Sequence, residues 1–182
     1  MTPIWVLIGI NLLLFIVTSI ARDLILSLGL IPAVIGDRPW TIITSIFLHG
    51  SIGHILVNMI TLYFFGGYLC ALVGLGKFLT IFLIGGISGN VLYLLLGQPF
   101  SIAIGASGAV FALGGVLAVM RPRLRVFVFP LPVPLPLWVV VIGGFLIISF
   151  FPNVAWQAHL GGLAFGLAIG YFFRKRQRLY FG

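Results

Sequence analysis

The chain has 182 residues, of which 62% are hydrophobic and only 7% are charged. A soluble globular domain carries about 25% charged residues, so this composition excludes that class and indicates a polytopic helical membrane protein. The formal net charge of +8 does not indicate a nucleic-acid-binding protein. The basic residues cluster at the ends of apolar runs, where they orient a protein in the membrane.

Apolar runs follow one another along the whole chain. Each crossing of the hydrocarbon core requires about 20 apolar residues, which leaves room for about six spans and for no separate soluble domain. No basic segment precedes the first run, so we expect it to be a retained span and not a signal peptide. The fold we expect is an all-α membrane protein, with one six-span domain over residues 1–182. The expected spans cover about residues 4–21, 52–72, 78–97, 107–120, 136–151 and 156–173.

Two connections differ from the others. The first, about residues 22–51, is long and largely apolar, which favours a position in the membrane interface. The fourth contains Pro122 and four more prolines from Pro130 to Pro136, so it cannot be helical throughout.

The basic residues predict an orientation in the membrane. With six spans both termini lie on one side, and that side receives most of the basic residues, namely Lys77, Arg121, Arg123, Arg125, Arg174, Lys175, Arg176 and Arg178. The positive-inside rule then places both termini in the cytoplasm. The compact form favours a prokaryotic inner membrane, with an organellar membrane as the alternative. The second, fourth and sixth spans all begin at the outer face, so residues in their first turns can meet at one depth.

Polar residues occupy those three first turns. His54 and Asn58 are four residues apart, on one face of the second span, while Ser107 opens the fourth span and His159 lies near the start of the sixth. Ionisable groups at membrane depth are rare and are usually functional. These positions therefore predict a polar site on the outer side of the membrane.

Small residues indicate how the serine and the histidine come together. Gly162 and Gly166 follow His159 at the spacing of a G-x-x-x-G ladder, which lets two helices pack closely. The fourth span offers matching small residues in two pairs, Gly108 with Ala112 and Gly114 with Ala118. If these surfaces pack together, Ser107 and His159 come within hydrogen-bond reach.

The chemistry of this set is nucleophilic catalysis. A serine hydroxyl needs an adjacent base, and His159 is the candidate. The Ser107 N–H is unpaired at a helix start, and together with Asn58 and His54 it can stabilise an oxyanion. Glycine at 105 and 108 allows close approach of backbone and substrate.

No carboxylate completes a triad. Both acidic residues, Asp23 and Asp37, fall in the first connection. We therefore predict a Ser107–His159 dyad in which packing orients the imidazole. Phe111, one helical turn after Ser107, is placed to stack on it.

The motifs resemble those of the rhomboid family of intramembrane serine proteases. They are G-x-S-G at Gly105–Gly108, H-x-x-x-N at His54–Asn58 and A-H-x-x-G-x-x-x-G from Ala158 to Gly166. The resemblance implies that Ser107 is the nucleophile, that His159 is the general base, and that Asn58 and His54 line the oxyanion hole. It implies cleavage of single-span membrane proteins near the outer membrane surface, with no metal or cofactor.

Two positions depart from the family pattern. Trp40 is followed by Thr41, where many members have Trp-Arg, and Phe111 stands where many bacterial members have tyrosine. The first departure bears on contacts of the first connection. The second retains a ring beside the histidine without its hydroxyl.

A short fourth span predicts a cavity. Fourteen residues of helix cover about 21 Å, whereas the hydrocarbon core is about 30 Å thick. Ser107 should therefore lie below the outer surface, in a wet cavity lined by residues 97–106. The fifth span and residues 150–156 form the gate expected by analogy with the family.

Other interpretations of the same residues remain. Ser107 and His159 can serve only helix packing, His54 and Asn58 can form a structural clamp, and His49 is best read as structural. A zinc site of His49, His54 and His159 is conceivable, although nothing in their spacing requires one. Non-enzyme alternatives are a pseudoprotease that binds membrane proteins and a small transporter. The sequence does not indicate an oligomeric state.

Overall fold

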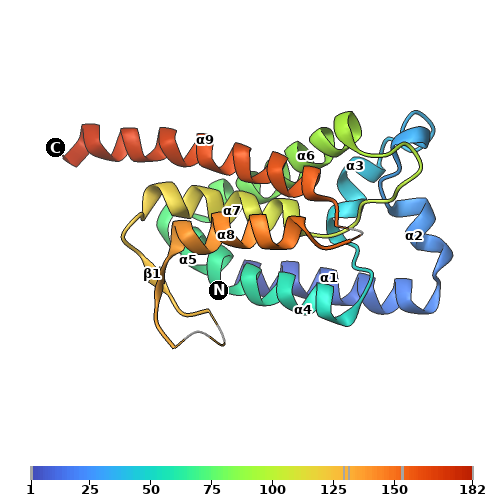
Figure 1. Ribbon diagram of the computed structural model, residues 1–182, viewed down its shortest axis with the longest axis horizontal. Helices are drawn as coiled ribbons and strands as arrows, with labels where there is room; N and C mark the ends of the chain where they lie inside the picture. Colours follow the sequence, from blue (N-terminus) through green and yellow to red (C-terminus); the bar gives the residue numbers. More distant parts are fainter. Residues whose placement is uncertain (1, 129, 131, 153, 182) are drawn as a thin grey trace.

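The computed structural model describes residues 2–128, 130, 132–152 and 154–181. Within these residues the protein is mostly helical, and its long helices lie side by side (Figure 1). Three of the described helical stretches are long and apolar enough to cross a membrane, namely Pro3–Ile20, Ile52–Val73 and Leu75–Leu96. Two shorter apolar helices are Ser107–Met120 and Leu137–Ser149.

The helices follow the expected runs closely. The bounds are α1 Thr2–Ile20, α4 Ile52–Thr61, α5 Gly67–Val73, α6 Leu75–Leu96, α7 Ser107–Met120, α8 Leu137–Ser149 and α9 Trp156–Phe181. Helices α4 and α5 are continuous through a π-helical segment, η3 (Leu62–Gly66). Only α9 departs clearly from its predicted bounds, because it continues to Phe181 and not to residue 173. Its last turns contain Arg, Lys and Gln, which favour helix, and no Gly or Pro interrupts them. The side chains of Arg176 and Arg178, predicted as anchors, lie outside the described residues.

Loop 1, residues 21–51, is folded. It contains α2 (Asp23–Leu28), η1 (Pro32–Val34), α3 (Thr41–Thr44) and η2 (Ser45–Phe47). Three of its side chains donate to successive carbonyls at the end of α2, which satisfies groups that a helix end leaves unpaired. These bonds are Arg38 Nη1 to Leu26 O (2.7 Å), Trp40 Nε1 to Ser27 O (3.1 Å) and Thr44 Oγ1 to Leu28 O (2.6 Å).

The expectation of an all-α chain needs one correction. After α7 the chain forms two short antiparallel strands, β1 (Arg125–Val126) and β2 (Leu135–Pro136), which we call the ribbon. Proline cannot donate a backbone hydrogen bond and holds its chain away from helix, so this proline-rich connection is extended. Residues 129 and 131, between the strands, lie outside the described residues.

Loop 1 and the ribbon lie at opposite ends of the helices. Helices α2 and α3 mark one end, while the ribbon and the C-terminal end of α9 mark the other (Figure 1). The Lys77 ammonium lies 5.8 Å from the Phe173 ring centre, and Arg174 donates to the Val119 carbonyl at 3.5 Å. Basic residues from three segments of the sequence thus gather at the ribbon end.

Helix α7 is the centre of the core. Most of its residues are buried, and it packs most extensively against α9 and then against α6. A methyl group on Gly162 or Gly166 would overlap the carbonyl oxygen of Gly108 or Ala112, so the two backbones are in direct contact. The predicted ladder is therefore confirmed for Gly108 with Ala112.

Gly114 of the second small-residue pair does not serve this interface as expected. Gly114 faces Val141 of α8 and Phe65 of η3, while its neighbour Gly115 faces the α9 backbone. Each residue turns a helix by about 100°, so Gly108 and Ala112 share a face that Gly114 does not.

Candidate active site

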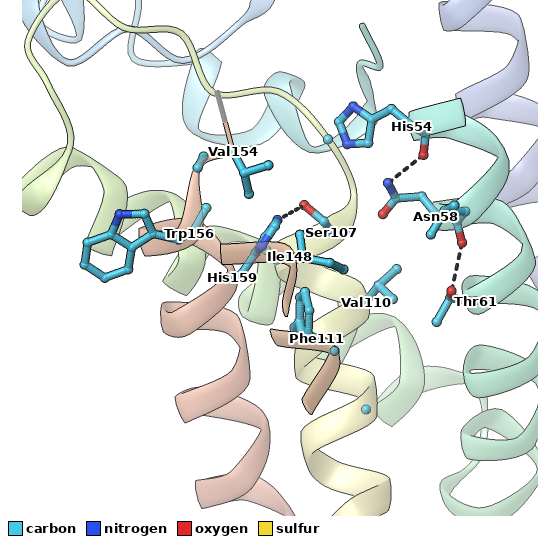
Figure 2. A pocket seen from close by; sticks show the side chains of 18 of the residues that line it. His54, Asn58, Thr61, Ser107, Val110, Phe111, Ile148, Val154, Trp156 and His159 are labelled. Carbon is cyan, nitrogen blue, oxygen red and sulfur yellow. Dashed lines mark hydrogen bonds between the residues drawn. The ribbon is translucent and has the colours of Figure 1, made fainter. Parts of the chain in front are cut away.

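Ser107 and His159 are hydrogen-bonded. Their Oγ and Nε2 atoms lie 2.7 Å apart (Figure 2). Ser107 is the first residue of α7, and His159, which is only 6% exposed, lies in the first turn of α9. The predicted hydrogen-bond reach between these two side chains is confirmed.

Three helices meet at this point. A methyl group on Gly108 of α7 would lie 3.1 Å from the Ala158 carbonyl oxygen, and one on Gly89 of α6 would overlap it. The start of α9 is therefore held between α6 and α7, directly beside His159. Gly89 was not among the predicted site residues, although the small residues Gly85, Gly86 and Gly89 in the third run are a packing signal of the same kind.

The His159 imidazole is oriented by packing. The centre of the Phe111 ring lies 4.9 Å from its own, with 36° between the planes. Nδ1 of His159 is buried and has no hydrogen-bond partner among the described residues. Asp23 and Asp37 are both in loop 1, and neither lines the cavity that contains His159. The predicted ring contact is present, and within the described chain the pair has no carboxylate partner.

His54 and Asn58 lie on α4, across the cavity from this pair (Figure 2). Ser51 caps α4 by accepting a hydrogen bond from the His54 N–H at 3.2 Å. The Asn58 amide donates one N–H to the His54 carbonyl at 2.9 Å. An amide nitrogen has a second N–H, so Asn58 retains a donor for another group.

Gly105 connects the two sides of the site. Its φ angle is +131°, a conformation that side chains rarely adopt. A methyl group here would lie 2.7 Å from His54 Nε2 and 3.6 Å from Ser107 Oγ. The predicted need for glycine at 105 therefore has two causes, the backbone conformation and the approach of the His54 ring.

His49 lies behind His54 and outside the cavity. It is 1% exposed, and its ring meets the His54 ring edge-on, with centres 4.9 Å apart. Neither ring nitrogen has a hydrogen-bond partner among the described residues. Burial, aided by the nearby His54, lowers the pKa of His49 from 6.5 to about 3. His49 is therefore neutral at physiological pH, and its place in the structure fits a packing role.

The described residues contain no group of three or more His, Cys, Asp or Glu side chains that could hold a metal ion. The three histidines considered for zinc thus do not converge on one point. His49 turns toward His54, while His159 bonds Ser107.

A large, mainly apolar cavity of about 2130 Å³ is lined by the four predicted polar site residues, Ser107, His159, His54 and Asn58. Loop 3, residues 97–106, lines one end, as predicted, and the cavity continues between η3 and α8 as far as Leu124 and Val126 at the ribbon. Small-molecule pockets usually measure about 300–1,000 Å³. This cavity therefore has room for a polypeptide segment beside Ser107.

Asn90 of α6 and Ser45 of loop 1 were missed by the sequence analysis. Both are buried, and Asn90 Nδ2 donates to Ser45 Oγ at 2.9 Å. A lone asparagine in an apolar run is a signal that could have identified Asn90. Nothing local in the sequence marks Ser45 as its partner.

The sequence matches known proteins. Residues 36–176 match the family model described as the Rhomboid domain. Over 137 residues the chain is 32% identical to RHOMBOID-like protein 4 of Arabidopsis thaliana. This match covers 75% of this chain and 34% of that protein. It is 28% identical to the putative rhomboid protease YdcA of Bacillus subtilis, over 78% of this chain and 71% of the relative.

A third relative is the Rhomboid-like protease 3 of Toxoplasma gondii, 29% identical over 79% of this chain and 55% of the relative. The matched part of the chain thus spans 34% of the length of the plant relative and 71% of the length of the bacterial relative.

Proposed function

The chain belongs to the rhomboid family of integral membrane proteins, and from this premise we propose that it is an intramembrane serine endopeptidase. Its substrates are transmembrane segments of single-span membrane proteins, cut near the outer membrane face. The observation that carries the proposal is the 2.7 Å hydrogen bond between Ser107 Oγ and His159 Nε2 inside a large apolar cavity. Relatives named as rhomboid proteases in Bacillus subtilis and Toxoplasma gondii support it.

The proposed reaction begins at Ser107. Its Oγ attacks the scissile carbonyl carbon while Nε2 of His159 takes the hydroxyl proton. The carbonyl oxygen becomes an oxyanion, which accepts hydrogen bonds from the Ser107 N–H, from Asn58 and from His54. His159 then gives its proton to the leaving amine, and the C–N bond breaks. Water then attacks the acyl carbonyl carbon while His159 takes its proton. The acyl C–O bond breaks, His159 returns the proton to Ser107 Oγ, and the new carboxyl end leaves.

Packing replaces the carboxylate of a triad in this proposal. Phe111 lies against one side of the imidazole, and the contact of Ala158 with Gly89 and Gly108 holds the backbone beside His159. An ionised carboxylate at this depth would be costly to bury. A neutral Ser–His pair avoids that cost and retains the geometry for proton transfer.

We further propose a six-span arrangement in which α7 is a short fourth span. Its 14 residues cover about 21 Å, so it cannot reach both surfaces of a core about 30 Å thick. The basic residues at the ribbon end favour that end in the cytoplasm, with both termini, in a prokaryotic inner membrane. Ser107 then faces the outer side, beneath loop 1.

The substrate in this proposal is a helix that partly unwinds at Ser107. Most of the lining is apolar, in particular along η3 and α8, which suits a hydrophobic segment. Polar side chains line it around Ser107 and also elsewhere, among them Thr61 of α4 and Gln98 of loop 3. Val154 of the connection between α8 and α9, and Trp156 at the start of α9, also line it (Figure 2). Movement of α8 and this connection would admit the substrate from the lipid.

The test is cleavage of a single-span reporter by the full chain in liposomes. Ser107→Ala and His159→Ala should each lower kcat by at least about 10³-fold, because the dyad acts as a unit. Ser19→Ala is a matched control, since within the described residues this serine bonds only the Phe15 carbonyl of its own helix. A fluorophosphonate should label the wild type at Ser107. Absence of cleavage on several reporters together with absence of labelling would favour a pseudoprotease.

A further inference from the structure

Loop 1 rests on α6 at two positions one helical turn apart. A methyl group on Gly86 would lie 2.7 Å from the Ile46 Cδ1 atom, so η2 lies directly on the α6 backbone there. At the next turn, Asn90 Nδ2 donates to the Ile42 carbonyl at 2.7 Å and to Ser45 Oγ at 2.9 Å. An amide nitrogen has two N–H groups, so both are used to hold loop 1.

Loop 1 in turn holds the residues that lead to Ser107. The Ser45 carbonyl accepts the Gly105 N–H at 2.9 Å. Farther along, Leu30 and Ala103 exchange two backbone hydrogen bonds, of 3.0 and 2.8 Å. Loop 3 is thus attached to loop 1 just before α7 begins. Of these attachments, the one at Gly105 lies closest to the nucleophile, two residues before it.

We propose that Asn90 is a positioning residue that acts on Ser107 through Ser45 and Gly105. By holding Ser45, the amide fixes the carbonyl that anchors Gly105 in its φ +131° conformation. The same turn also contacts the His54 ring, because His54 Nε2 is the nearest atom to a methyl group built on Gly105. Asn90 therefore sets both the nucleophile and one proposed oxyanion donor without touching either.

The anchor is effective because both of its ends are rigid. Asn90 and Ser45 are 7% and 1% exposed, so water does not compete for their hydrogen bond. Helix α6 is packed against α7 and α9, the helices that carry Ser107 and His159. A shift of about 1 Å in a catalytic group can cost about 100-fold in rate. Loss of the Asn90 bond should therefore affect the chemical step more than substrate binding.

The experiment compares Asn90→Leu, Ser45→Ala and the double variant with Asn11→Leu in the full chain. Asn11 is a matched control, because it is fully buried and its amide donates to a carbonyl of its own helix, that of Leu7, at 2.7 Å. The first measurement is hydrogen exchange of the Gly105 amide, which does not depend on catalysis. The second is kcat and KM for reporter cleavage, which rests on the proposed function.

We expect Gly105 exchange to accelerate in Asn90→Leu and in Ser45→Ala, but not in Asn11→Leu. We expect kcat to fall about 10- to 100-fold with KM within roughly twofold. The double variant should be no worse than the more impaired single variant, because both changes break one chain of contacts. Where Asn90→Leu does not fold, Ser45→Ala decides the question by the same exchange measurement.

Unchanged Gly105 exchange in folded Asn90→Leu or Ser45→Ala would overturn the positioning role. An equal loss of kcat in Asn11→Leu would also overturn it, since that loss would reflect general destabilisation. If the wild type cleaves no reporter and a fluorophosphonate does not label Ser107, the proposed function fails, while Gly105 exchange still decides whether Asn90 holds this turn.

Discussion

The two sides of α7 are built differently. On the α9 side, glycines bring the backbones into contact, and a methyl on Gly162 or Gly166 has no room. On the α8 side the contacts are fewer and are made by side chains: a methyl on Gly114 would lie 3.1 Å from a Val141 methyl, whereas Gly143 and Gly144 of α8 have nothing within 4 Å of the position a methyl would take. The α9 side, which carries His159, is closely packed, whereas the α8 side, which the proposed substrate would approach, has fewer contacts.

This difference shows how one helix can serve two needs. No carboxylate in the described part of the chain lies beside the Ser107–His159 hydrogen bond, so its geometry depends on the backbone contacts between α7 and α9. In the proposed function a substrate helix approaches Ser107 past α8, which has fewer close contacts with α7 than α9 has.

The largest expected effect is that of Gly166→Ala. Its methyl would overlap the Ala112 carbonyl, so α7 and α9 must separate. The free energy of unfolding should fall by about 3 kcal/mol. Thermal unfolding in detergent would measure it. Gly143→Ala is the matched control on the open side, and it should be neutral or slightly stabilising. Equal effects of the two substitutions would contradict the difference between the sides.

Gly105→Ala should mainly remove activity. The φ of +131° is strained for alanine, and the methyl would lie 2.7 Å from His54 Nε2. We expect a cost of about 2 kcal/mol in the free energy of unfolding and at least about a tenfold loss of kcat. Fluorophosphonate labelling of Ser107 should slow in parallel. Labelling at the wild-type rate would show that the Gly105 turn does not position the nucleophile.

His49→Phe should reduce the sensitivity of stability to acid. The folded-state pKa of His49 is about 3, below its ordinary value of 6.5, so the unfolded chain binds the proton more readily. Its contribution to stability is therefore complete above pH 6.5 and is lost as pH falls toward 3. Phenylalanine keeps the ring without a titratable group or unpartnered nitrogens. Unfolding curves in detergent at pH 7.5 and 5 compare the wild type with His49→Phe. An identical pH dependence of the two proteins would exclude this contribution of His49 to acid sensitivity.

Phe111→Leu should have the smallest effect. Phe111 contacts the His159 ring at 4.9 Å and the Phe145 ring of α8 at 6.0 Å, so it touches both sides of the site. Loss of an aromatic pair costs about 0.5–1.5 kcal/mol, which corresponds to a roughly two- to tenfold decrease in kcat. Reporter cleavage measures this decrease. Phe111→Tyr keeps the ring and should retain more of the rate than leucine does.

The long-range architecture was accessible from local patterns. Five of the expected apolar runs became helices whose bounds lie within three residues of the prediction. The pairing of Ser107 with His159 followed from their positions at span starts and from the glycine ladder after His159. Both inferences rest on periodicity, which a sequence displays directly.

Other features escaped because they depend on partners distant in sequence. Asn90 bonds Ser45 across 45 residues, and Gly89 packs on the Ala158 carbonyl. The hydrogen bonds of loop 1 to the end of α2 were hidden for the same reason. The ribbon was missed because prolines exclude a helix without specifying which extended segments will pair.

The sequence by itself determined that this is a helical membrane protein of the rhomboid family, and which side chains can perform its proposed chemistry. Hydrophobic runs must be helical in lipid, since every backbone group needs a partner there. Only the tertiary structure decided how loop 1 attaches to α6, which extended segments pair in the ribbon, and what holds Gly105. Those outcomes depend on atomic contacts between separate segments, and spacing within one segment does not encode them.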